Sequence, residues 1–176
     1  RSHYLNRNHP EDNAYTLLCI AQVYLKMNQP DSALIYTRQG YQMAIKLSVG
    51  GFILLSTRIF GDIYLEKGED ETALTYFRQY LPDFVKYKER NRDLGFVLNS
   101  MAKIFQKRNI FDSAILYAKR ALENAQEYED LENLSTAGML LSDYYQRKDD
   151  HAAFVYLKIA TKAKDSMRSI DKLRQA

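Results

Sequence analysis

Four short segments of the chain resemble one another and recur at nearly constant spacing. Each carries an alanine followed three residues later by a tyrosine, within Asp31–Tyr36, Glu71–Tyr76, Asp112–Tyr117 and His151–Tyr156. The alanines step by 40, 41 and 39 residues, and the tyrosines keep the same steps. A period of about 20 to 50 residues is typical of repeat arrays, in which each unit buries its apolar face against the next. The sequence therefore predicts a stack of about four similar units.

A further aromatic column, earlier in each unit, keeps the same steps. It belongs to an apolar stripe at i, i+3, i+4 and i+7, which indicates an amphipathic helix. The four stripes are Leu17, Ile20, Ala21, Tyr24; Thr57, Phe60, Gly61, Tyr64; Leu98, Met101, Ala102, Phe105; and Ala137, Leu140, Leu141, Tyr144. A second stripe follows in each unit from the repeated alanine. We therefore predict two helices per unit, and four helix hairpins in all.

Small residues in these stripes would let two helices approach closely, with the aromatic ring filling the space beside them. Ala21, Gly61 and Ala102 meet this condition in the first three units. The bulky Leu141 stands in the fourth, so we expect a wider spacing there. The tyrosines of the columns are interpreted as core residues with their hydroxyls at a wet rim.

Residues that tolerate a left-handed backbone close the first helix of three units: Asn28, Gly68 and Asn109. Lys148 stands at the fourth place, so that helix is expected to end without such a residue. Two glycines at 50 and 51 are expected to reverse the chain after the first hairpin.

The predicted organisation is an irregular segment at residues 1–11 and an array at 12–175. Its repeats cover about 13–50, 51–90, 91–130 and 131–165, and the last helix continues as an extended exit helix to about residue 175. The apolar positions of that helix keep roughly the seven-residue spacing of a coiled-coil seam: Ala160, Ala163, Met167, Ile170 and Leu173.

Composition argues against several classes of protein. The chain has 46% hydrophobic and 27% charged residues, and no segment has the roughly 18 consecutive apolar residues of a membrane span. Residues 157–176 hold six Lys or Arg against two Asp, which we interpret as a solvated helix face, so no nucleic acid is expected. The lone Cys19 excludes an internal disulfide. Because the chain begins at Arg1 without Met, we expect a fragment of a longer protein.

Motifs that carry chemistry are missing from the sequence. There is no Gly-rich phosphate loop and no His, Cys and carboxylate cluster at metal-ligand spacing. We therefore predict no catalytic residues, no metal and no cofactor.

The small and aromatic columns followed by Gly, Asn and Asp turns resemble the tetratricopeptide repeat (TPR) family over residues 13 to about 165. This resemblance implies an all-α fold, a right-handed superhelical α-solenoid of about four TPR-like hairpins. The chain departs from the family in having Leu17, Thr57, Leu98 and Ala137 where an aromatic residue is usual, and in a period near 40 rather than about 34. Lengthened repeats ending in a basic helix are similar to those of bacterial signalling proteins, notably the TPR-containing sensor histidine kinases of Bacteroidota.

Members of the family hold a peptide or partner helix on the concave face formed by their first helices. Helical geometry then predicts partner-binding residues at Tyr15, Gln22, Arg58, Asp62, Asn99, Lys103 and Tyr145. Arg58 and Asp62, at i and i+4, have an alternative role as a surface ion pair. The two-Lys, two-Asn clamp of members that bind chaperone tails is not reproduced here.

The predicted function is a non-catalytic scaffold for protein or peptide binding, within the sensory or interaction region of a larger bacterial signal-transduction protein, either a sensor histidine kinase or a transcriptional regulator. The alternatives are a stand-alone adaptor, a dimerisation module, or a peptide-regulated phosphatase-like regulator. A homodimer through the repeat ends or the C-terminal helix is a further expectation. A membrane would be involved only through sequence outside this chain, and an extracytoplasmic (periplasmic) location is favoured over a cytoplasmic one.

Overall fold

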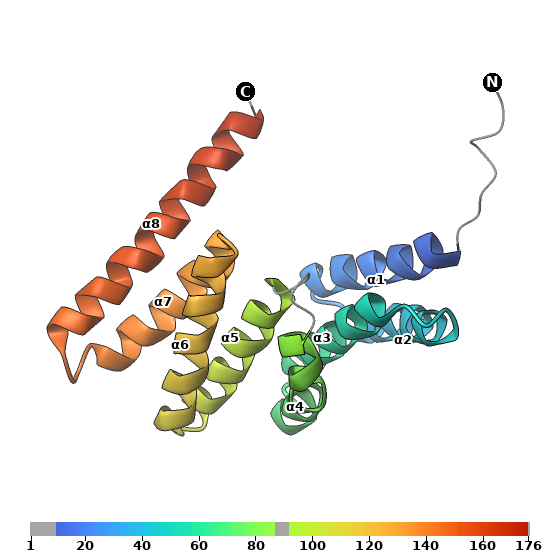
Figure 1. The fold of residues 1–176 in the computed structure, drawn as a ribbon, viewed down its shortest axis with the longest axis horizontal. Coiled ribbons are helices and arrows are strands. Elements are labelled where there is room, and N and C mark those ends of the chain that lie inside the picture. Colours follow the sequence, from blue (N-terminus) through green and yellow to red (C-terminus); the bar gives the residue numbers. More distant parts are fainter. Residues whose placement is uncertain (1–9, 87–91, 176) are drawn as a thin grey trace. The chain divides into compact units, whose positions relative to one another are not determined.

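The computed structural model describes residues 10–86 and 92–175, which form helices joined by short turns (Figure 1). This confirms the all-α class. The helices of these ranges are α1 (Pro10–Lys26), α2 (Pro30–Lys46), α3 (Gly50–Glu66), α4 (Asp70–Lys86), α5 (Arg92–Lys107), α6 (Phe111–Glu127), α7 (Leu131–Tyr145) and α8 (Asp150–Gln175). In the described ranges, no helix is both long enough and apolar enough to span a bilayer.

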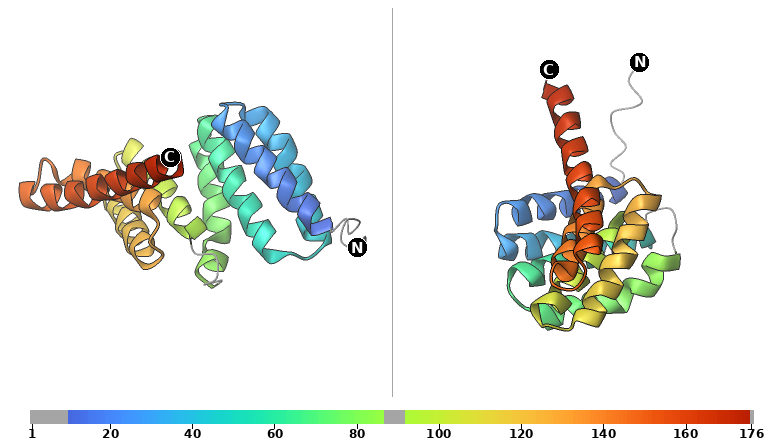
Figure 2. Two further views of the ribbon diagram at one scale, coloured as in Figure 1. Left: turned by 90° about the horizontal axis from the view of Figure 1, so that it is seen from above. Right: turned by 90° about the vertical axis from the view of Figure 1, so that its left-hand side faces the viewer.

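The chain divides into two compact units, residues 1–86 and 87–176. In the first unit α1 pairs with α2 and α3 pairs with α4, and α3 also packs on both α1 and α2 (Figure 2). The second unit repeats this scheme. There α5 pairs with α6, α7 pairs with α8, and α7 packs on both α5 and α6. Each unit is thus two helix hairpins, the later one packed on the earlier.

The repeated alanines lie where the helices meet. Ala33 and Ala73 are 0% exposed, and Ala114 and Ala153 are each 8% exposed. Gly61 shows how close the helices come, because a Cβ atom added to it would lie 2.0 Å from Cε1 of Phe77. The prediction that small residues permit close helix packing is confirmed at these positions.

Stacked aromatic pairs join the two helices of the first three hairpins. The ring centroids of Tyr24 and Tyr36 lie 5.2 Å apart, those of Tyr64 and Tyr76 lie 5.4 Å apart, and those of Phe105 and Tyr117 lie 5.4 Å apart. The planes of each pair are within 11° of parallel. Stacking in this range adds stability beyond the burial of ring area.

The fourth hairpin differs from the prediction by one residue. Tyr145, rather than the expected Tyr144, stacks on Tyr156 at 5.6 Å. The stripe of α7 is therefore Gly138, Leu141, Ser142 and Tyr145, all half-buried or buried. Ser142 is then the small residue of the column, and its Oγ donates to the carbonyl oxygen of Ala153 at 3.0 Å. The expectation that Leu141 widens the spacing is wrong, because Leu141 corresponds to Met101.

A shorter interval between the stacked aromatics accompanies the shift. Twelve residues separate the stacked aromatics of the first three hairpins, whereas eleven separate Tyr145 from Tyr156. The φ angles of Asn28, Gly68 and Asn109 are 56°, 74° and 59°, which confirms their left-handed role. The turn described between α7 and α8 has no residue with positive φ, as the sequence predicted from Lys148.

The first hairpin ends earlier than predicted. Gly50 and Gly51 lie inside α3, and the reversal falls on Ser48, whose φ is 57°. The amide of Val49 donates to the carbonyl oxygen of Ala44, and that of Ser48 donates to that of Ile45. These two hydrogen bonds satisfy the last carbonyl groups of α2, so the left-handed C-terminal end of this helix forms without a glycine.

The N-terminal end of the array also differs slightly. The helix α1 begins at Pro10, within the segment predicted to be irregular, and proline suits the first turn of a helix. The rest of that segment, residues 1–9, lies outside the described residues.

Candidate binding surfaces

Four of the predicted partner-binding residues lie in the first unit. Tyr15 is 50% exposed and its ring stacks on that of Phe52 at 5.7 Å, while Gln22 is half-buried. Nη1 of Arg58 lies 3.2 Å from Oδ2 of Asp62, so these two residues form the ion pair that was the alternative for them. The guanidinium and the carboxylate therefore already contact each other on the face of α3.

Asn99 in the second unit is buried rather than presented to solvent. It is 3% exposed, and its Nδ2 donates to the backbone oxygen and to Oδ1 of Asn133 at 3.1 and 3.0 Å. Asn133 in turn donates from its backbone amide to the N-cap carboxylate of Asp130. Asn99 thus joins α5 to the N-terminus of α7, which corrects its assignment to a partner-binding surface.

Tyr145 also has a packing role, because it is the stacking residue of the fourth hairpin. Nζ of Lys119 lies 5.9 Å from the centre of its ring, and a hydrogen bond to Tyr145 raises the pKa of Lys119. Lys103, by contrast, is exposed on α5 as predicted. With the one-residue shift, the outward positions are instead Met139 and Asp143 of α7 and its C-cap Gln146, which are exposed.

Sequence reasoning missed these three residues, although a signal for them was present. The choice of Ser142 over Leu141 as the small residue favours the shifted stripe. Tyr144 fits the spacing of the aromatic column, which favours it over Tyr145 when only the sequence is considered.

A pocket of about 430 Å³ lies between the α5–α6 hairpin and α7. Its buried lining is apolar and includes three alanines, Ala102, Ala114 and Ala118, together with Leu141. Its more exposed lining residues are Gln106, Phe111, Ile115, Leu140, Asp143, Tyr144, Gln146, Arg147 and Lys148. The pocket thus combines an apolar floor with a rim of amides and of charges of both signs.

Tyr144 lies at the edge of this pocket. The residue before the stacking aromatic in α3 is Ile63, which is 0% exposed and packs in a cluster with Ile59 and Ala33. Tyr144 is the corresponding residue in α7. Its ring lies 5.9 Å from that of Phe111 and 4.2 Å from Nζ of Lys148, which also hydrogen-bonds its hydroxyl. Tyr144 is thus half-buried at the edge of the pocket, whereas the corresponding Ile63 is fully buried.

The chemistry of the pocket favours binding of an apolar group with polar surroundings. The residues that line it include no Ser, Thr, Cys or His. In the described part of the chain, no group of three or more His, Cys, Asp or Glu residues is placed to hold a metal ion. Glutamine amides at the rim have donors and acceptors that match a peptide backbone.

Comparison of the chain with family models, with curated proteins and with solved structures found no match. The interpretation of the site therefore depends on its own geometry.

Proposed function

We propose that this chain is a non-catalytic helical-repeat module that binds a segment of another polypeptide. In this proposal the hairpins stack as a right-handed α-solenoid similar to that of tetratricopeptide repeats. The support is the packing within each unit, where the first helix of the later hairpin contacts both helices of the earlier one. Nearest-neighbour packing of this kind is how solenoids extend.

The single observation that carries the binding function is the pocket between the α5–α6 hairpin and α7. In the first unit, by contrast, the residue that corresponds to Tyr144 is the fully buried Ile63. Pockets of about 300 to 1,000 Å³ with a mainly apolar lining and a few polar groups are typical of ligand sites. At about 430 Å³, this pocket is at the small end of that range.

The lining indicates what kind of group enters. The alanines of α5 and α6 leave an apolar floor, where an apolar side chain would be removed from water at a gain of about 25 cal/mol per Å². Gln106 and Gln146 lie beside it and would bond the backbone that carries this side chain. Asp143 and Arg147 have opposite charges, so the rim does not restrict the partner to one sign of charge. We infer an extended or helical segment with one apolar anchor residue.

The wider role that we propose is the sensory or interaction region of a larger bacterial signalling protein. It depends on the resemblance of the lengthened repeats and basic last helix to those of TPR-containing sensor kinases. In this role, occupancy of the pocket would be the event that is reported to the rest of the protein.

A peptide selection tests the binding proposal. Peptides selected from a random phage-displayed library on the immobilised chain would be synthesised, and their affinities measured by calorimetry. Ala114→Leu, which places an isobutyl group in the pocket, should weaken the selected peptides by about tenfold or more, since 1.4 kcal/mol of lost binding is tenfold. Because Ala114 also lies where the helices meet, this variant should melt at a lower temperature, and its helical circular dichroism at the binding temperature verifies that it is folded.

The matched control is Ala152→Leu, which adds the same group to a half-buried alanine of α8 outside the pocket. It should bind the selected peptides as the wild type does. Undiminished affinity in Ala114→Leu, or failure to enrich any peptide, would contradict the proposal.

A further inference from the structure

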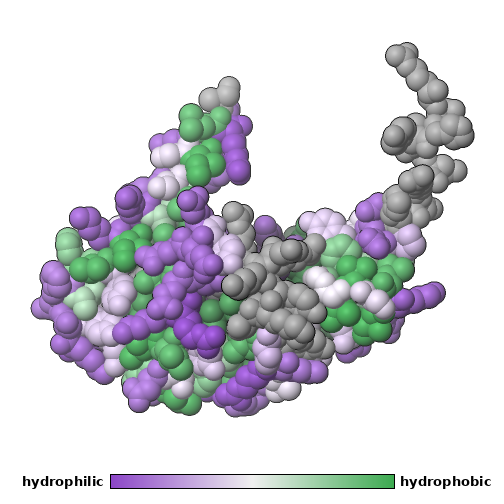
Figure 3. Space-filling model, viewed as in Figure 1, coloured by the Kyte–Doolittle hydropathy of each residue, from purple (hydrophilic) through white to green (hydrophobic). Residues whose placement is uncertain are grey.

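The last helix continues well beyond the helix it packs on. The helix α8 has 26 residues and α7 has 15, so at 1.5 Å per residue their lengths are about 39 and about 22 Å. The first part of α8 packs on α7 through Ala153, Ala160 and Ala163, all buried. The C-terminal part extends past α7, and apolar surface reaches its end (Figure 3).

The packing seam of α8 does not stop where α7 ends. Residues 153, 156, 160 and 163 alternate by three and four, and the alternation continues through Met167, Ile170 and Arg174. This is the spacing of positions a and d of a coiled coil. Ile170 is nevertheless 41% exposed. The second half of the seam therefore has the pattern of a helix-packing surface that the helices of its own unit cover only in part.

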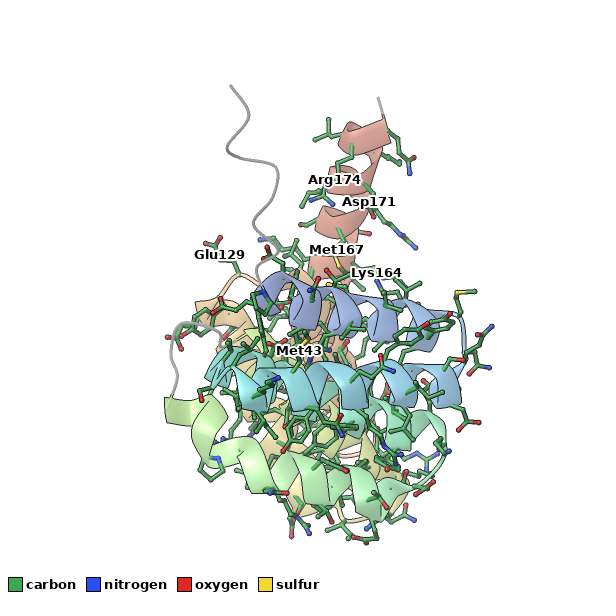
Figure 4. The ribbon with its side chains drawn as sticks, turned by 90° about the vertical axis from the view of Figure 1, so that its right-hand side faces the viewer. Met43, Glu129, Lys164, Met167, Asp171 and Arg174 are labelled. Atoms are coloured by element: carbon green, nitrogen blue, oxygen red, sulfur yellow. The ribbon has the colours of Figure 1, made fainter. Side chains whose placement is uncertain are left out.

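An acidic groove adjoins this part of the seam. It has a volume of about 560 Å³ and lies between the C-terminal half of α8 and the N-terminal ends of α5 and α7. Its apolar lining residues are Phe96, Leu131, Met167 and Ile170, and its charged ones are Asp93, Glu129, Asp130, Glu132, Asp171 and Arg174. The lining thus holds five carboxylates and one guanidinium, and the carboxylate of Asp130 also accepts hydrogen bonds from Asn133 as the N-cap of α7. Figure 4 shows Met167, Asp171 and Arg174 along the end of α8, and Glu129 on the turn before α7.

The helix α8 itself has the complementary charge. Its exposed cations are Lys158, Lys162, Lys164, Arg168, Lys172 and Arg174. Over the same stretch it carries only two carboxylates, Asp165 and Asp171, and Asp165 lies 3.7 Å from Arg168. One chain therefore presents both an acidic, partly apolar groove and a basic, amphipathic helix. Complementary charge of this kind steers association and sets its register.

We propose that the groove takes α8 of a second copy of this chain, with the two helices antiparallel about a two-fold axis near Met167 and Ile170. In a two-fold interface each copy supplies the same surface, so the groove and the helix are each used twice. The partly covered seam of one copy then packs on that of the other, and Met167 of one meets Ile170 of the second.

Two exposed charges define the orientation. Ala163 and Ile170 are d positions of the seam, and Lys164 and Asp171 directly follow them. Lys164 and Asp171 therefore lie on the same edge of α8. They are seven residues and about 10.5 Å apart along the axis, too far to pair within one helix. In an antiparallel pair this edge faces the same edge of the other helix. Lys164 of each copy then lies opposite Asp171 of the other.

A parallel pair would not provide these contacts. The edge would then face the opposite flank of the seam, which carries Ile159, Ser166 and Leu173. Both charges would lack a partner there. The charge pattern therefore selects the antiparallel arrangement.

Reversing the charge of Lys164 or of Asp171 tests the antiparallel arrangement. Sedimentation equilibrium of the chain over a dilution series should show a monomer–dimer equilibrium that weakens as salt rises toward about 1 M, where charges are screened beyond about 3 Å. Lys164→Asp and Asp171→Lys should each raise the dimer dissociation constant about tenfold, because each creates two like-charge contacts. An equimolar mixture of the two variants should regain the wild-type constant as a heterodimer.

The control is Arg38→Asp, the same change of charge on an exposed residue of α2, which should leave the constant unchanged. Circular dichroism of each variant verifies its fold. A chain that is monomeric throughout the dilution series at low salt overturns the proposal, as does a dimer that is insensitive to the single variants. Weakened variants that fail to recover on mixing overturn the antiparallel pairing. Peptide binding in the α5–α7 pocket is measured independently and does not depend on these outcomes.

Discussion

The ring of Tyr145 lies 5.6 Å from that of Tyr156, with 21° between their planes, while the adjacent Tyr144 contacts Phe111 instead. The fourth hairpin thus keeps the stacked pair of the other three, although the interval between its stacked aromatics is one residue shorter. Residue type does not distinguish the two adjacent tyrosines, so the packing of α7 on α8 determines which of them faces the partner helix. That choice also leaves Tyr144 beside the candidate peptide pocket.

Removing the stacked ring of Tyr145 should lower the free energy of unfolding more than removing the ring of Tyr144. We expect Tyr145→Ala to lower the free energy of unfolding by about 1–3 kcal/mol, because it removes a half-buried ring and its stacking contact. Tyr144→Ala, its matched control, should cost less, since that ring lies at the edge of a pocket. Urea denaturation followed by circular dichroism measures both. A larger loss in Tyr144→Ala would contradict the observed register.

Gly61 should not tolerate any side chain. Its Cβ would lie 2.0 Å from Cε1 of Phe77, which is fully buried. We expect Gly61→Ala to destabilise the first unit by about 1–3 kcal/mol through overpacking. Gly50→Ala is the control, because nothing lies within 4 Å of its Cβ position at the start of α3. It should raise the stability by up to about 1 kcal/mol, since alanine restricts the unfolded chain. Equal melting temperatures for the two variants would disprove the close approach.

Asn99 should matter for stability and not for partner capture. Asn99→Leu removes the donor that serves two oxygens of Asn133, at a cost of about 1–3 kcal/mol. Lys103→Ala, one turn further along α5 and exposed, should change stability by less than about 0.5 kcal/mol. Thermal unfolding checks the first expectation, and binding of the selected peptides to both variants checks the second. Wild-type stability of Asn99→Leu would show that the buried amide contributes nothing.

Alkaline pH should weaken the first unit through two contacts. A hydrogen bond to Asp31, 2.7 Å away, raises the pKa of Lys67 above 10.5, and a hydrogen bond to Tyr36 raises the pKa of Tyr24 above 10.0. Both groups hold their proton more tightly when folded. Their contribution is therefore complete at neutral pH and is lost as the pH rises through the raised pKa values.

The measurement is the melting temperature between about pH 8 and pH 12, which spans the ordinary values of both groups. The double variant Lys67→Met, Tyr24→Phe should lose less stability over this range than the wild type does. A steeper loss of stability with rising pH in the double variant than in the wild type would contradict the predicted direction. The isosteric nature of Tyr24→Phe keeps the stacked ring in place.

The sequence predicted much of the fold because its signals are local. The alanine and tyrosine columns located the hairpins, and Asn28, Gly68 and Asn109 located three of the turns. It failed to place the reversal after α2, which falls on Ser48 rather than on Gly50 and Gly51. The backbone hydrogen bonds that end α2 form there without a glycine. It also failed at Asn99 in the candidate site, because the residue that buries Asn99 is Asn133, far away in the chain.

By itself, the sequence determined that the chain forms paired amphipathic helices, since apolar periodicity and left-handed turn residues act within a few residues of one another. Only the tertiary structure decided that Tyr145 stacks, that Asn99 is buried, and that a pocket and an acidic groove remain open in the second unit. These features depend on how closely helices distant in the chain approach, and that distance is a property of packed side chains rather than of any local pattern.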